Sequence, residues 1–232
     1  MMPGMSMLHY YGPHMGPPLP AITLELLYLL IILGLCAYVY VRLKDIASLS
    51  KHKGIFHFSN IFLYFGIAYL VRSVLVIMPL LRQEFLIPWP RQWMSVAMAV
   101  VFYSSTMAAF STVLAAMYRR IKEPDWLQLA LHIVSAVLAF VAWLSRSYPL
   151  LLIIQSVIML GAIVAILLDT RMHSHNKVTY ILLFIFWLCN VLLTARWLLP
   201  PSSQALFYAL SIAVFASVSF RVRKRYAHAK EA

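Results

Sequence analysis

The chain alternates between long apolar segments and short polar loops. Each apolar segment is long enough to cross a bilayer, because a helix rises 1.5 Å per residue and the hydrocarbon layer is about 30 Å thick. Only helices are expected, since lipid offers an open backbone no hydrogen-bond partners. The pattern predicts an all-α membrane protein with seven transmembrane helices, over residues 21–43, 56–81, 92–118, 126–145, 149–168, 178–199 and 203–220.

Composition supports this interpretation. Hydrophobic residues make up 63% of the 232 residues and charged residues 11%, whereas ordinary soluble domains are about half apolar and a quarter charged. We therefore expect one transmembrane domain over residues 21–220. An external tail rich in Met, His and Pro (1–20) would precede it, and a basic cytoplasmic tail (221–232) would follow.

Positive charges fix the expected orientation. Fourteen Lys and Arg residues follow the first, third, fifth and seventh segments, and three lie in the other loops. Short loops rich in Lys and Arg stay in the cytoplasm, which predicts a multi-pass cell-membrane protein with its N-terminus outside and its C-terminus inside. The net charge of +12 then faces the anionic inner leaflet of the bilayer and gives no reason to expect nucleic-acid binding.

A weak internal repeat is visible. Shifting the chain by 124 residues gives six identities in 28 positions, among them Lys53 on Lys177, and Arg72 on Arg196. This spacing predicts two parallel three-helix units joined by the fourth helix, an arrangement found in carriers such as the SWEET proteins. Chance or shared membrane composition is the alternative explanation.

Polar residues inside the apolar segments are the candidate ligand site. Glu25, Arg72 and Arg196 all fall in the outer part of the membrane, where ionisable groups tend to face a bundle interior or a cavity. One carboxylate neutralises one guanidinium, so convergence would leave a positive charge for an anionic ligand. Gln155 and Asn190 could add neutral hydrogen bonds. The alternative for Glu25 and Arg196 is that both side chains reach the headgroups.

Soft metal ligands form a second candidate site. The first twenty residues combine methionines with histidines, a ligand set that favours copper(I). This tail resembles the Met/His-rich ectodomains of copper importers, and a Met-x-x-x-Met spacing in the third segment resembles their intramembrane ligands. Methionine is also a common packing residue. The candidate copper ligands are Met5, Met7, His9, His14, Met94 and Met98. No other cofactor is expected.

Function is the least constrained property. No catalytic motif is present, so we expect a protein that is not an enzyme, and we expect His132 to be an interior hydrogen-bonding residue. The topology resembles the seven-helix sensor modules of prokaryotic membrane receptors, which implies a ligand-binding role. Only twelve residues follow Phe220, so a signal would pass to a separate membrane or cytoplasmic protein. A small-anion carrier and a copper(I) protein are the alternatives.

Overall fold

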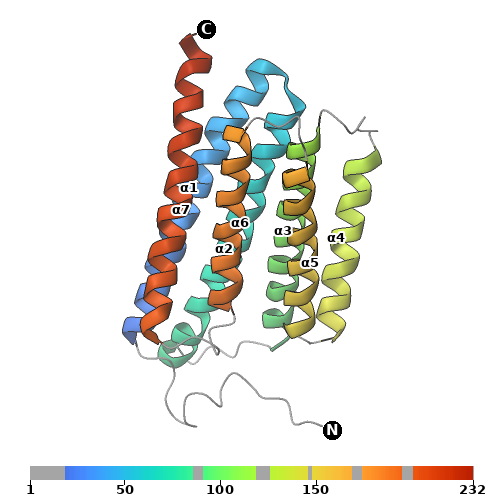
Figure 1. Cartoon of the computed structure of the whole chain (residues 1–232). Coiled ribbons are helices and arrows are strands. Elements are labelled where there is room, and N and C mark those ends of the chain that lie inside the picture. The colour runs from blue at the N-terminus through green and yellow to red at the C-terminus, as the bar shows by residue number, and fades with distance from the viewer. Residues whose placement is uncertain are drawn as a thin grey trace.

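The computed structural model describes residues 19–85, 91–118, 126–145, 148–168, 174–194 and 201–231. Within those ranges the chain is all-α, as predicted, and contains no strand (Figure 1). The helices are α1 (Leu19–Ser50), α2 (Lys53–Phe85), α3 (Arg91–Met117), α4 (Trp126–Ser145), α5 (Tyr148–Leu168), α6 (Ser174–Thr194) and α7 (Pro201–Glu231).

The described helix boundaries lie within four residues of the predicted apolar segments, apart from two longer extensions, and the predicted end of the sixth segment at 199 lies outside the described residues. α1 continues to Ser50 and α7 to Glu231, well past the last apolar residues. Neither extension contains the proline or glycine that would interrupt the backbone hydrogen bonds of a helix. The basic tail expected after residue 220 is therefore helical as far as Glu231.

A tight turn joins α1 to α2. Lys51 has a φ of 52°, a left-handed conformation that ends α1. The amide of Ile55 then donates to the carbonyl of His52 at 3.0 Å, and the His52 imidazole hydrogen-bonds the Tyr118 hydroxyl at 2.6 Å. A Cβ on Gly54 would lie 2.5 Å from the Tyr118 ring, so this position needs glycine for the close approach.

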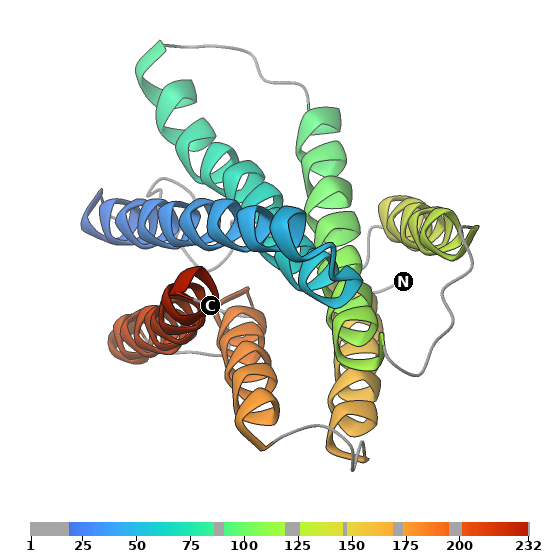
Figure 2. The same cartoon turned by 90° about the horizontal axis from the view of Figure 1, so that it is seen from above.

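Six of the helices close into a ring. α1 contacts α2, which contacts α3, and the cycle continues through α5, α6 and α7 back to α1. α4 lies outside the ring and packs mainly on α3 (Figure 2). The start of α1 and the end of α7 lie at opposite ends of the bundle (Figure 1).

Aromatic side chains fill the centre of the ring. Phe215 of α7 is fully buried, and its ring centroid lies 5.6 Å from that of Phe62 on α2 and 4.7 Å from that of Phe186 on α6. α2 and α6 therefore face each other across the ring. Phe62 and Phe186 are also equivalent residues in the 124-residue repeat, which stays a prediction.

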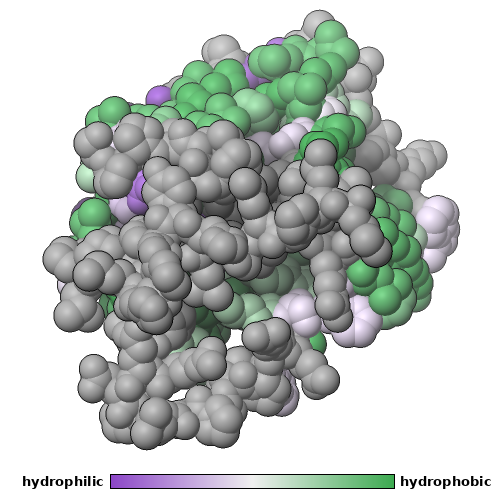
Figure 3. Space-filling view, turned by 90° about the horizontal axis from the view of Figure 1, so that it is seen from below, coloured by the Kyte–Doolittle hydropathy of each residue, from purple (hydrophilic) through white to green (hydrophobic). Residues whose placement is uncertain are grey.

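The described helices indicate a membrane protein. Four segments are long and apolar enough to span a bilayer: Ile22–Ser50, Lys53–Met78, Trp93–Met117 and Ser203–Lys224. The apolar parts of α4, α5 and α6 are shorter, at Trp126–Val141, Ile153–Leu168 and Lys177–Leu193. Hydrophobic side chains cover much of the visible flanks of the bundle (Figure 3). Seven crossings and the orientation of the termini stay predictions.

Candidate functional site

A buried ion pair joins the first two helices. The Arg72 Nη2 atom on α2 lies 3.0 Å from the Glu25 Oε1 atom on α1. The Glu25 side chain is 7% exposed and the Arg72 side chain 19% exposed. This pairing confirms that the two residues face the bundle, and a ligand-binding role for either stays a prediction. Because the carboxylate neutralises the guanidinium, Arg72 does not present a free positive charge here.

A tyrosine cluster lies one helical turn from the ion pair. The Tyr28 hydroxyl of α1 donates to the Asn190 Oδ1 atom of α6 at 2.9 Å. It also lies 2.9 Å from the Ser211 hydroxyl of α7 and 3.1 Å from the Tyr69 hydroxyl of α2. Tyr69 donates to the same Asn190 oxygen. The Asn190 amide nitrogen donates to the Phe186 carbonyl of its own helix at 2.8 Å, which fixes the direction of the carboxamide.

The ion pair and the tyrosine cluster lie on the same faces of α1 and α2. Glu25 and Tyr28 are three residues apart on α1, and Tyr69 and Arg72 are three apart on α2, so each pair shares a helix face. We call this structure the polar network, and it consists of Glu25, Tyr28, Tyr69, Arg72, Asn190 and Ser211. It links α1, α2, α6 and α7 through side chains alone.

Proton counting shows that the polar network is tightly coupled. A tyrosine hydroxyl has one hydrogen to donate, and that of Tyr28 goes to Asn190. The Ser211 hydroxyl must therefore donate to Tyr28 for their contact to be a hydrogen bond. Tyr28 is 1% exposed, so water cannot replace a lost partner. A change at Tyr28 therefore affects side chains on three other helices.

Gln155 is a predicted site residue that lies apart from the polar network, and a second, Arg196, is not described. Gln155 is half-buried on α5, and among the described residues no hydrogen bond links it to the polar network. Arg196 lies outside the described residues. The predicted anion site between Arg72 and Arg196 therefore stays a prediction.

The predicted copper ligands fall mainly outside the described part of the chain. Met5, Met7, His9 and His14 all lie outside the described residues. Met94 is exposed and Met98 half-buried, one turn apart near the start of α3. Among the described residues, no group of three or more His, Cys, Asp or Glu side chains could hold a metal ion.

His132 of α4 is an interior hydrogen-bonding residue, as predicted. Its Nδ1 atom lies 2.6 Å from the Tyr103 hydroxyl of α3, and its Nε2 atom lies 3.4 Å from the Tyr64 hydroxyl of α2. A neutral imidazole has one donor and one acceptor nitrogen, so one tyrosine donates to the ring and the other accepts from it. These bonds tie α4 to the ring of six helices.

Sequence reasoning missed half of the polar network. Tyr28, Tyr69 and Ser211 were not candidates, because uncharged polar residues are frequent in this chain and none interrupts an apolar segment as a charge does. Their one signal is spacing. Tyr28 follows Glu25 by three residues and Tyr69 precedes Arg72 by three, which places each tyrosine on the face already expected to turn inward.

Comparison with known proteins gives one close match in length and sequence. A protein of Archaeoglobus fulgidus described as "Uncharacterized protein" is 32% identical over 219 residues, an alignment that covers 90% of this chain and 95% of the relative. The chain belongs to the same family as this archaeal protein. The similarity spans nearly the whole of both chains. No protein-family model matches the chain, and no solved structure does.

Proposed function

We propose that this protein is a non-enzymatic, multi-pass protein of the cell membrane that works as a sensor-like ligand-binding module or accessory subunit. One observation carries the proposal: the Tyr28 hydroxyl contacts side chains from three other helices. A buried hydroxyl with these partners couples four helices at one point. Such coupling suits a protein that converts a local event into a helix movement.

The route of the signal follows from the same coupling. Polar groups are costly in hydrocarbon and are kept where they hold a structure or a function. A ligand or a proton that displaced one member of the polar network would leave its partners unpaired, and the four helices would repack to satisfy them. The basic end of the bundle would carry this repacking to a partner protein beside the anionic inner leaflet.

A small-anion carrier is the second candidate. The order of the six-helix ring, with α4 outside it, supports this reading because parallel three-helix repeats with a connecting helix occur in carriers. Two observations rank it second. Glu25 neutralises Arg72, and aromatic rings fill the centre of the ring, at Phe62, Phe186 and Phe215. Copper(I) binding or uptake is a third candidate and rests on the methionine and histidine pattern alone.

Flux measurements separate these functions. The purified protein, reconstituted in liposomes, would be tested for uptake of a panel of small anions and of copper(I). The sensor proposal expects uptake equal to that of protein-free liposomes. It also expects one compound of the same panel to change the distance between spin labels on the inner ends of α1 and α7. Saturable anion uptake that Arg72→Leu abolishes would overturn the sensor proposal in favour of the carrier.

A further inference from the structure

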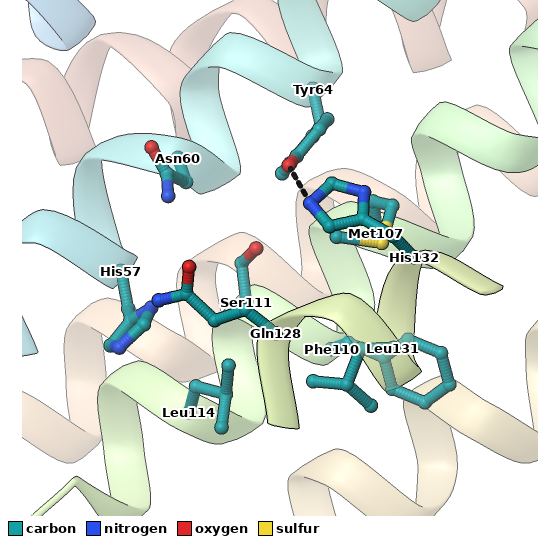
Figure 4. Close-up of a pocket in the computed structure, with 10 residues that line it drawn as sticks. All are labelled: His57, Asn60, Tyr64, Met107, Phe110, Ser111, Leu114, Gln128, Leu131 and His132. Atoms are coloured by element: carbon teal, nitrogen blue, oxygen red, sulfur yellow. Dashed lines mark hydrogen bonds between the residues drawn. The ribbon is translucent and has the colours of Figure 1, made fainter. Parts of the chain in front are cut away.

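A second polar site lies between α2, α3 and α4. It is a small cavity beside the starts of α2 and α4 and the end of α3, far along α2 from the ion pair. We call it the α4 pocket. Most of its lining residues carry hydrogen-bonding side chains. The lining consists of His57, Asn60, Tyr64, Met107, Phe110, Ser111, Leu114, Gln128, Leu131 and His132 (Figure 4).

The size of the α4 pocket selects water as its occupant. The cavity has a volume of about 20 Å³. A buried water molecule needs about 10–15 Å³ counted in the same way, so the cavity holds roughly one water molecule and no organic ligand. A buried water also needs several polar partners. Asn60, Tyr64 and Gln128 supply hydroxyl and carboxamide groups from two helices.

The polar lining runs from one end of the bundle as far as His132. Gln128 lies in the first turn of α4 and is exposed, and it shares the lining of the pocket with His57 near the start of α2. On the far side of His132 the contacts are apolar. There Ala139 of α4 packs against Phe102 of α3, and both residues are buried. Water therefore approaches His132 from the end of the bundle where α2 and α4 start.

His132 can take up a proton without losing a hydrogen bond. Its Nδ1 atom contacts the Tyr103 hydroxyl at 2.6 Å, and its Nε2 atom contacts the Tyr64 hydroxyl at 3.4 Å, the bond drawn in Figure 4. A neutral imidazole needs one tyrosine to donate and the other to accept, whereas an imidazolium donates from both nitrogens. Either tyrosine oxygen can accept, so the ring keeps two hydrogen bonds in both states.

The surroundings of His132 carry no fixed charge. The titratable side chains that face it are His57 and Tyr64 of α2 and Tyr103 of α3. α4 and α5 contain no Asp, Glu, Lys or Arg, and the one charged residue of α3 is Arg91, at the other end of that helix. His132 is half-buried. A positive charge there costs less than in dry hydrocarbon, because water and oxygen atoms surround it.

We infer that the α4 pocket holds a bound water and is a proton-binding site, with His132 as the proton acceptor. The Tyr103 oxygen accepts from the Nδ1 hydrogen, and the Tyr64 hydroxyl donates to Nε2. A proton from the end of the bundle passes from the bound water to the Tyr64 oxygen, while the Tyr64 hydrogen moves to Nε2. Tyr64 again carries one hydrogen, the water has passed on the proton it received, and His132 has gained one. This site is separate from the polar network and stands whether the protein is a sensor or a carrier.

Hydroxyl-radical footprinting tests for the bound water. Short X-ray pulses on the full-length protein in nanodiscs split water into hydroxyl radicals, which oxidise only side chains close to where they form. Mass spectrometry then maps the oxidised residues. Met107 lines the α4 pocket and Met159 of α5 does not, although both are buried, at 5% and 4% exposure. Met107 should be oxidised several times faster than Met159, and equal rates would overturn the bound water.

Deuterium exchange at the histidine Cε1 carbon tests for the proton. In heavy water this carbon exchanges through the protonated ring, so the exchange rate rises with pD and levels off where the histidine titrates. His132 should show such a profile. Asn60→Leu should slow its exchange roughly fivefold, the effect of one lost neutral hydrogen bond, and should leave His52 unchanged, because the His52 ring bonds Tyr118 outside the pocket.

The variants keep the result decisive. Gln128→Leu tests the same path and replaces Asn60→Leu if that protein fails to fold, since Gln128 is exposed. Ser217→Val is the control, because Ser217 is exposed on α7 and its hydroxyl bonds its own helix at 2.8 Å. Its exchange at His132 should equal that of the natural sequence. A rate at His132 that never levels off with pD, or that neither pocket variant changes, would overturn the proton-binding site.

Discussion

The Glu25–Arg72 ion pair gives the sharpest stability prediction. Arg72→Leu removes the guanidinium and leaves the Glu25 carboxylate, 7% exposed, without its countercharge. Glu25→Gln leaves the Arg72 guanidinium, 19% exposed, in the same position. The first change should destabilise more than the second, because the more deeply buried charge is the harder one to hydrate. The double variant removes both charges at once.

The magnitudes follow from the burial of the pair. Breaking a buried ion pair by removing one partner costs about 3–5 kcal/mol, whereas replacing both partners can be close to neutral. Arg72→Leu should fall in that range, and Glu25→Gln near its lower end because Arg72 retains some exposure. For a chain of this size 1 kcal/mol corresponds to a shift of about 2–4 °C in Tm. The Arg72→Leu protein should therefore melt roughly 6–20 °C below the natural sequence.

A double-mutant cycle provides the assay. Melting of the four proteins would be followed in one detergent, and steric-trap unfolding in bicelles would supply free energies. The double variant should lose less than the sum of the single losses, by about 1 kcal/mol or more. Glu25→Gln combined with Arg223→Leu is the control cycle, since Arg223 is exposed on α7, and its losses should add. Additive losses for Glu25 and Arg72 would refute the pairing.

Three further changes test other parts of the structure. Tyr28→Phe should lower the free energy of unfolding by about 1–3 kcal/mol, because the buried partners of the Tyr28 hydroxyl are left without their hydrogen bond. Tyr38→Phe on the exposed face of α1 should change the free energy of unfolding by no more than about 0.5 kcal/mol in the same assay. Gly54→Ala should destabilise by about 1–3 kcal/mol through the clash with the ring that covers it. Gly34→Ala, which has open space around it, should instead stabilise α1 by up to about 1 kcal/mol, and thermal melting compares the two. Deleting residues 1–15 should abolish high-affinity copper(I) binding without unfolding the helices. Competition with a copper(I) chelator would measure the binding, and equal binding by the full-length and the shortened protein would exclude the tail as the copper site.

Helix positions were predictable because a membrane-crossing helix needs a minimum apolar length. α4 begins and ends where the apolar segment 126–145 does, and α5 begins one residue before segment 149–168. The extensions of α1 and α7 were not predictable from hydropathy. The polar sequences that follow residues 43 and 220 contain no residue that stops a helix at once. α1 ends only at the left-handed turn of Lys51.

The inward faces of the helices were much harder to predict. A soluble helix shows its buried face as an apolar stripe, but a helix in lipid is apolar all round. Glu25, Arg72 and Asn190 were identifiable because charged and amide side chains are unusual in such segments. Tyr28 and Ser211 gave no comparable signal, and only the packing of α1 against α2 and α7 shows that they belong to the same polar network.

The repeat predicted the fourth helix as a connector between two three-helix units, but the side-chain contacts that hold α4 beside the six-helix ring were not predicted. His132 was expected to form hydrogen bonds inside the bundle, and it does. The sequence did not indicate its partners, Tyr64 of α2 and Tyr103 of α3. A single sequence does not indicate which tyrosine meets which histidine across helices. The two hydrogen bonds that join α4 to α2 and α3 were therefore found only in the structure.

Accessibility of the two ends of the chain tests the central claim, an odd number of membrane crossings with the N-terminus outside. Single cysteines would replace Ser6 and Ala229 in a background in which the buried Cys36 and Cys189 are changed to alanine. A membrane-impermeant maleimide would then be added to intact cells. We predict labelling at position 6 before permeabilisation and at position 229 only after it. Labelling of both positions in intact cells, or of position 229 alone, would contradict this topology.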